Sequence, residues 1–155
     1  MNRKHASLIA AGAATAVLLP LARVLPLGQA GATPGSGTSS SIVARGTTDR
    51  DIRLRAEQPS DLVLARVTLE PGGSTGWHTH PGPQLVVVQS GTLTRYDRGC
   101  HAQTYTANEA FKEIPGVHMA ANKTSEPVVL GVTFIVPTGG PLSDDAPAPK
   151  CAAGL

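Results

Sequence analysis

Two histidines separated by one residue, His78 and His80, are the clearest candidates for chemistry in this sequence. Side chains alternate between faces along an extended strand, so both imidazoles would project from one face, about 7 Å apart at the backbone. Two imidazoles at that separation can converge on one cation. The spacing therefore predicts a metal site on a strand that includes both residues.

A turn and further polar side chains follow these histidines. The sequence Pro81-Gly82-Pro83 is typical of a chain reversal and leads into a new strand that starts at Gln84. The amide oxygen of Gln84 can then point back into the same space as the imidazoles. Downstream, His118 follows another Pro-Gly turn and offers a third imidazole.

Together these segments resemble the paired motifs of the cupin family. Gly72, five residues, His78-x-His80, three residues, Gln84, six residues and Gly91 resemble the first motif, and Pro115-Gly116-x-His118-x-x-x-Asn122 resembles the second. In that family, two histidines and an acidic residue of the first motif and a histidine of the second ligate a divalent metal inside a small β-barrel. The resemblance, which covers residues 63–137, implies that the metal ligands here are His78, His80, Gln84 and His118.

The chain departs from the family pattern in two ways. Gln84 stands where the family has Glu, which makes every proposed ligand neutral. The second motif lacks one residue before His118, and Glu109 stands where the family usually has Gly. Three imidazoles and one amide oxygen suit Fe, Mn, Ni, Cu or Zn and leave positions open for water, substrate or dioxygen. The alternative role for Gln84 is to hydrogen-bond around a three-histidine site without binding the metal.

Other polar residues have no spacing that assigns them a role. Tyr96, Arg66 and Glu113 could reach the mouth of the barrel, where each could supply a proton or a charge. His101 lies in an expected loop, and we predict that it is solvated rather than part of the metal site.

Short apolar runs with turn residues between them make up most of the chain after residue 41, and no segment there shows a convincing helical period. An all-β architecture follows. The resemblance implies a double-stranded β-helix, or jelly roll, as a cupin β-barrel domain over residues 42–137. The strands expected besides those that carry the histidines lie within residues 42–46, 51–57, 61–70, 84–90, 92–97, 104–111 and 127–136.

The segments that flank this domain have their own signals. Residues 1–32 combine a basic start, an apolar run and small residues that offer cleavage after Ala30 or Ala32, which predicts a signal peptide and a secreted or extracytoplasmic protein. An uncleaved anchor is the alternative, but the run is shorter than the ~20 residues that a membrane span needs. After cleavage we expect no stable membrane association. Residues 33–41 are predicted to be a flexible linker and residues 138–155 an extended tail.

The two cysteines, Cys100 and Cys151, both lie in the exported part. A disulfide is expected between them in an oxidising compartment, and two free thiols are the alternative. The bridge would tie the C-terminal tail to the loop after Gly99. In the chain-entropy model, closing such a loop contributes on the order of 4 kcal/mol.

The charge balance bears on the partners. The 155-residue chain has 13 basic and 11 acidic residues. Three of the basic residues lie in the predicted leader, which leaves a nearly neutral domain with ten. No stripe of Lys or Arg favours nucleic acid, so we expect a small-molecule partner. Because many cupins pair through an outer sheet, the resemblance also allows a homodimer.

Our leading hypothesis is a secreted cupin that holds one divalent transition metal and acts on a small organic molecule by Lewis-acid or dioxygen chemistry. The competing hypothesis is a module that binds a small ligand or a metal without catalysis, since one fold hosts both classes. A third is a cupin barrel that binds no metal.

Overall fold

The computed structural model describes residues 36–56, 59–113 and 115–153. The predicted signal peptide and the first residues of the predicted linker lie outside these ranges. Residues 36–41 are exposed and contain no strand or helix. Within the described ranges, no helix has the length and apolar character that crossing a membrane requires.

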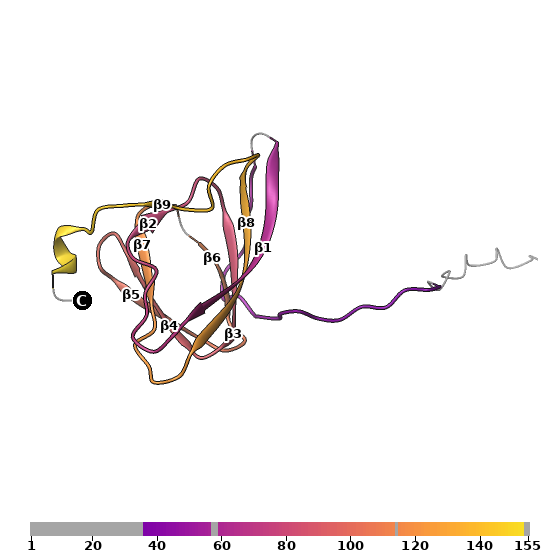
Figure 1. Cartoon of the computed structure of the whole chain (residues 1–155), viewed down its shortest axis with the longest axis horizontal. Coiled ribbons are helices and arrows are strands. Elements are labelled where there is room, and N and C mark those ends of the chain that lie inside the picture. The colour runs from indigo at the N-terminus through magenta and orange to yellow at the C-terminus, as the bar shows by residue number, and fades with distance from the viewer. Residues whose placement is uncertain (1–35, 57–58, 114, 154–155) are drawn as a thin grey trace, which may run out of the picture. The chain divides into compact units, whose positions relative to one another are not determined.

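The described residues form strands in two antiparallel sheets that face each other (Figure 1). One sheet has the strand order β1-β8-β3-β6 and the other has the order β5-β4-β7-β2-β9. The prediction of an all-β double-stranded β-helix is confirmed. The strands are β1 (Ser60–Leu69), β2 (His78–Thr79), β3 (Gln84–Ser90), β4 (Thr92–Asp97), β5 (Ala102–Thr106), β6 (Ala110–Lys112), β7 (His118–Ala121), β8 (Val128–Pro137) and β9 (Asp144–Asp145).

Strands β1 and β8 pair along their whole lengths, from Ser60 opposite Pro137 to Leu69 opposite Val128. On β8, every second residue is buried, which is the alternation that its β-branched run predicts. These inward side chains meet those of β3 and β4 in a mainly aliphatic core. Its buried members are Leu69, Val86, Val88, Leu93, Phe111, Val128, Leu130, Val132, Phe134 and Val136.

The turn between β2 and β3 lies where the Pro81-Gly82-Pro83 sequence predicts it. A Cβ atom on Gly82 would lie 1.9 Å from the carbonyl oxygen of Ile135, which is closer than any real contact. The amide of Ile135 also donates to the carbonyl oxygen of Pro83 at 3.0 Å. This close approach to β8 requires glycine and fixes the turn that separates His80 from Gln84.

The strand predictions for residues 42–46 and 51–57 are wrong as far as the structure describes these residues, because none of 42–46 or 51–56 lies in a strand. The segment contacts the barrel backbone near Thr47, which forms an isolated parallel bridge with Glu109. Ile42 and Val43 are 68% and 75% exposed. Residues 51–56 do alternate between polar and apolar side chains, but a strand also needs a free sheet edge along its length.

The C-terminal segment adds to the second sheet. Asp144 and Asp145 form β9, which pairs with Thr79 and His78 of β2. The predicted Cys100–Cys151 disulfide is present, and a short 3₁₀ turn, η1 (Lys150–Ala152), surrounds Cys151. This segment was expected to be an extended tail. Both residues of β9 are exposed and pair through their backbone, so the sequence contains no apolar pattern that would predict the strand.

Candidate metal centre

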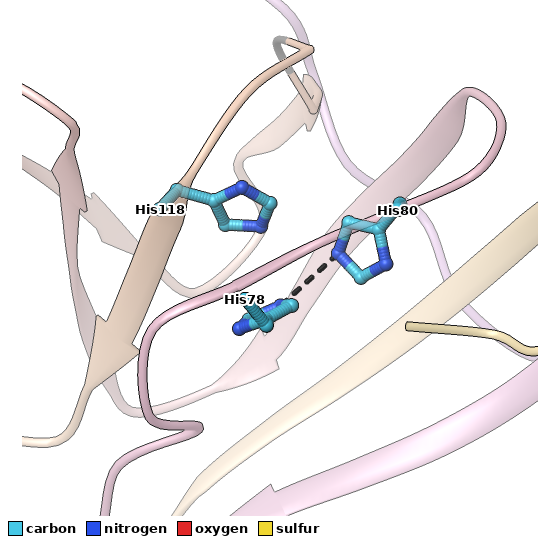
Figure 2. Close-up of side chains that lie close together, drawn as sticks. All are labelled: His78, His80 and His118. Atoms are coloured by element: carbon cyan, nitrogen blue, oxygen red, sulfur yellow. Dashed lines mark hydrogen bonds between the residues drawn. The ribbon is translucent and has the colours of Figure 1, made fainter. Parts of the chain in front are cut away.

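Three imidazoles meet between the sheets. His78 on β2 lies opposite His118 on β7 in the strand register, and their ring centroids are 4.4 Å apart. His80 follows two residues after His78 and points toward the same space (Figure 2). One nitrogen from each ring lies within 4.8 Å of the other two, so the three histidines could hold a metal ion. The parity argument correctly brought the two rings together, but β2 ends at Thr79, so His80 lies just outside the strand that was predicted to include both residues.

The other nitrogen of each ring is fixed by a backbone carbonyl oxygen. The distances are 2.9 Å from His78 Nδ1 to Gly76, 2.7 Å from His80 Nδ1 to Leu142 and 2.9 Å from His118 Nδ1 to Gly116. Because a carbonyl oxygen only accepts, each Nδ1 must carry the hydrogen. In a neutral imidazole, Nε2 then presents a lone pair, as metal-binding histidines usually do.

The distance between the Nε2 atoms of His78 and His80 tests whether the two imidazoles could share a metal. His78 Nε2 lies 3.1 Å from His80 Nε2, the contact that is dashed in Figure 2. With both Nδ1 atoms protonated, no hydrogen remains between two neutral rings at this position. Two nitrogens bound to one zinc ion at 2.0–2.1 Å in tetrahedral geometry would be about 3.3–3.4 Å apart. A shared cation would explain this contact, and a set of three imidazole nitrogens suits a divalent transition metal.

Burial favours the neutral form of His80 and His118. Desolvation lowers the pKa of His80 from its usual 6.5 to about 4, against an opposing effect of the Leu142 carbonyl. Desolvation also lowers the pKa of His118, while the nearby Glu113 carboxylate acts in the opposite direction. Neutral imidazole is the form that binds a metal.

Gln84 begins β3 and is 3% exposed, on the face that it shares with the buried Val86 and Val88. Its side-chain Nε2 is buried and has no hydrogen-bond partner among the described residues. An unsatisfied buried amide costs about 1–3 kcal/mol, which is a reason to expect a missing partner. Ligation of the metal by Gln84 stays a prediction, as does the alternative of a hydrogen-bonding role.

A buried ion pair lies beside the histidines. Arg95 on β4 donates from Nε to Oε1 of Glu113 at 2.8 Å, and their side chains are 4% and 9% exposed. The other carboxylate oxygen, Oε2, is 3.6 Å from Nε2 of His118. The backbone amide of Glu113 donates to the carbonyl oxygen of Gln84 at 3.1 Å, which ties the pair to the start of β3.

Sequence reasoning named Glu113 but missed its partner. Arg95 shares the inward face of β4 with Leu93, so a charged residue at a core parity was the available signal. Tyr96 is buried, and Arg66 is exposed on β1 and lines neither cavity described below. His101 is largely exposed and pairs with Asp97 at 3.0 Å, which confirms the prediction of a solvated residue.

A cavity of about 280 Å³ opens beside His80 and His118. A larger one, about 600 Å³, lies between residues 47–52 and strands β5 and β6, and none of the three histidines lines it. We assign the functional site to the smaller cavity because two candidate ligands, His80 and His118, line it. It is lined by Arg53, Arg55, His80, Pro81, Gly82, Pro83, Lys112, Glu113, Pro115, Gly116 and His118.

Comparison with known proteins gives one family. A family model described as Cupin domain matches residues 65–136, which include all four candidate ligands. Over 56 residues the chain is 44% identical to (R)-mandelonitrile lyase of Granulicella tundricola. That match spans 36% of this chain and 43% of the lyase, so less than half of the relative is represented.

Solved structures are also similar. A cupin-like protein of Thermotoga maritima is 24% identical, with a TM-score of 0.46 over 56% of this chain and 65% of the other. An uncharacterized conserved protein with a double-stranded β-helix domain from Klebsiella pneumoniae is 25% identical, with a TM-score of 0.49 over 74% of this chain and 98% of the other.

Proposed function

This chain belongs to the cupin superfamily, and we propose that it is a metal-dependent enzyme acting on a small organic molecule. The observation that carries the proposal is the 3.1 Å approach of the Nε2 atoms of His78 and His80, whose Nδ1 atoms are both held by carbonyl oxygens. The proposed ligands are His78, His80, His118 and Gln84, and the proposed cofactor is one of Fe, Mn, Ni, Cu or Zn.

The bound metal would supply Lewis acidity toward an oxygen of the substrate, or redox chemistry if it is a redox-active ion. The chain's own residues set the surroundings. The three backbone carbonyls orient the imidazoles before any ligand arrives, so little reorganisation is needed. Glu113, held by Arg95 beside His118, is placed to accept a proton from a substrate in the adjoining cavity.

Two reaction types fit this site, and one observation favours a lyase over an oxygenase. The partial match to (R)-mandelonitrile lyase covers 36% of this chain and connects it with an enzyme named for bond cleavage. A non-catalytic module that binds a metal or a small ligand is the competing function, because the same geometry serves binding alone.

Screens on metal-loaded protein separate these functions. We expect carbonyl-forming cleavage of small hydroxylated compounds without oxygen uptake, and loss of this turnover in His80→Ala. His101→Ala is the matched control, because His101 is exposed and is not among the residues that line the cavity. Turnover that is equal in all three proteins would place catalysis elsewhere, and oxygen consumption that depends on substrate would identify an oxygenase.

We further propose that the protein is secreted through the leader at residues 1–32. The Cys100–Cys151 disulfide supports this location, because such bridges persist in oxidising compartments. A homodimer formed through an outer sheet is proposed from the family resemblance. Sedimentation of the mature protein tests the dimer, and N-terminal sequencing of exported protein tests cleavage after Ala30 or Ala32.

A further inference from the structure

The larger of the two cavities, about 600 Å³, has the size of a ligand pocket. Pockets for small organic molecules are typically about 300–1,000 Å³ and combine apolar and aromatic side chains with a few polar groups. This cavity lies between residues 47–52, in the segment before β1, and the strands β5 and β6, each of which ends the strand order of one sheet. Its lining therefore comes from three separate parts of the chain.

A stacked pair of aromatic rings forms one wall of this cavity. Tyr105 on β5 and Phe111 on β6 both line it, and their ring centroids are 4.0 Å apart with an interplanar angle of 20°. Phe111 is 8% exposed, whereas Tyr105 is only partly buried. Phe111 is thus the inner ring of the pair and Tyr105 the outer one. A third ring could continue the stack on the other face of Tyr105, in the offset geometry that aromatic pairs prefer.

The segment that forms the second wall is held on both sides of the cavity. Thr47 makes two backbone hydrogen bonds of 2.8 Å, to residues 108 and 110. Further along, Nζ of Lys112 donates to the backbone carbonyl oxygen of Arg53 at 2.8 Å. Residues 48–52 therefore span the cavity between two fixed points, although they lie outside both sheets. A ligand would meet a wall that is already in place.

Charged groups of both signs line the cavity, and polar oxygens lie beside the rings. The hydroxyl of Tyr105 is 3.4 Å from Oε1 of Gln103. Because both signs are present, charge favours neither an anionic nor a cationic ligand. The carboxylate and amide oxygens can still accept a hydrogen bond from an uncharged ligand. The charged residues in the lining are Asp49, Arg50, Asp51, Glu109 and Lys112.

We propose that this cavity is a second small-molecule site, which binds an uncharged, planar aromatic molecule with a hydrogen-bond donor. The aromatic ring stacks on Tyr105 and contacts the apolar side chain of Ile52, which also lines the cavity. The site needs no metal and is independent of the proposed function. Lys112 and Pro115 line both cavities, so the bound molecule lies next to the histidine cavity.

Phenol and cyclohexanol form a matched pair of probes. Both are uncharged at neutral pH and carry one hydroxyl on a six-membered ring, but only phenol is planar and aromatic. Their affinities for the full exported chain can be measured by ligand-observed NMR titration. We expect phenol to bind about five times more tightly than cyclohexanol, because stacking adds to the burial of the ring. Equal affinities, or binding of neither probe, would overturn the proposal.

Substitutions of Tyr105 identify the source of this preference. Y105F keeps the ring, and phenol affinity should stay within about threefold of the wild type. Y105L keeps an apolar side chain against Phe111 but removes the ring, and the preference for phenol should disappear. A preference that persists in folded Y105L would overturn the proposal.

A second pair of variants tests the other wall without altering the core. Ile52 and Ile42 are 41% and 68% exposed, and Ile42 lines neither cavity. Phenol affinity should fall about threefold in I52S and stay unchanged in I42S. The same loss in both variants, or in neither, would contradict the assignment.

The variant H80A separates this site from the histidine cavity, because His80 lines only the smaller one. Phenol should bind equally to the wild type with and without metal and to H80A. Loss of phenol binding in H80A would move the site to the histidine cavity and overturn the proposal. Absence of metal from the wild type would contradict the proposed function and leave this prediction unchanged.

Discussion

The Nδ1 atom of His80 lies 2.7 Å from the carbonyl oxygen of Leu142, although 62 positions separate the two residues. The C-terminal segment therefore takes part in orienting a candidate ligand. The same segment pairs with β2 through Asp144 and Asp145, and the Cys100–Cys151 disulfide anchors its end. A C-terminal segment without apolar periodicity thus contacts the candidate metal ligand His80 and pairs with the strand that carries His78.

Truncation of the tail tests this relationship. A chain that ends at Gly140 lacks Leu142 and β9, and we expect its affinity for a divalent metal to fall about 10- to 100-fold, as is usual when a group that orients a ligand is lost. A chain that ends at Pro149 loses the disulfide but keeps Leu142 and β9, and it should stay within about threefold of the full chain. Competition titration with a chromogenic chelator measures both. Equal affinities for the two truncated chains would contradict the role of Leu142.

Loss of the carboxylate at position 113 should destabilise the barrel. In E113Q, the buried guanidinium of Arg95 loses its counter-charge, and removal of one partner from a buried pair typically costs about 3–5 kcal/mol. Urea unfolding of the metal-free protein measures the free energy of unfolding. D49N removes an exposed partner of Arg50 and should change it by less than about 1 kcal/mol. Similar effects from both substitutions would argue against a tightly coupled buried pair.

A methyl group at position 82 should disturb the turn between His80 and Gln84. The added Cβ of G82A would meet a backbone oxygen at 1.9 Å, so the turn or β8 must move, at a cost of about 1–3 kcal/mol. In G131A the nearest atoms are side-chain atoms of Ala44 and Gln89 at 3.3 and 3.4 Å, which makes it a milder control. Thermal unfolding and metal affinity should both suffer more in G82A. Unchanged metal affinity would show that this turn does not position the site.

The stability of the metal-free protein should depend on pH through His80. Its pKa is lowered to about 4 in the folded chain from about 6.5, so the unfolded chain takes up the proton first as the solution is acidified. Because the unfolded chain binds this proton more readily, the free energy of unfolding is highest above pH 6.5 and falls as the pH is lowered toward 4. Urea midpoints should therefore decline over this range, and less steeply in H80N. An identical decline in both proteins would assign the effect to other groups.

The fold was largely predictable because its strands carry their own signals. The alternating run in β8 and the turns after Pro81 and Ser90 indicated the strands directly. The segment at 51–56 showed a similar alternation without becoming a strand, since strand formation depends on a partner edge that one-dimensional patterns do not contain.

The three histidines of the candidate site were predictable from the sequence, but the residues that contact and orient them were not. Parity placed His78 and His80 together, and the second motif supplied His118. The contacts from Leu142 and Arg95 join residues far apart in the chain, so only the tertiary arrangement revealed them.

The account depends on a metal held by His78, His80 and His118, and elemental analysis tests it most directly. The measurement is metal content per chain for protein purified without chelator or nickel resin, alongside H80A and the control H101A. We predict about one divalent transition metal per chain in the wild type and in H101A, and strong loss in H80A. A wild-type chain that contains no metal, and that takes up none when Fe, Mn, Ni, Cu or Zn is added, would contradict the account.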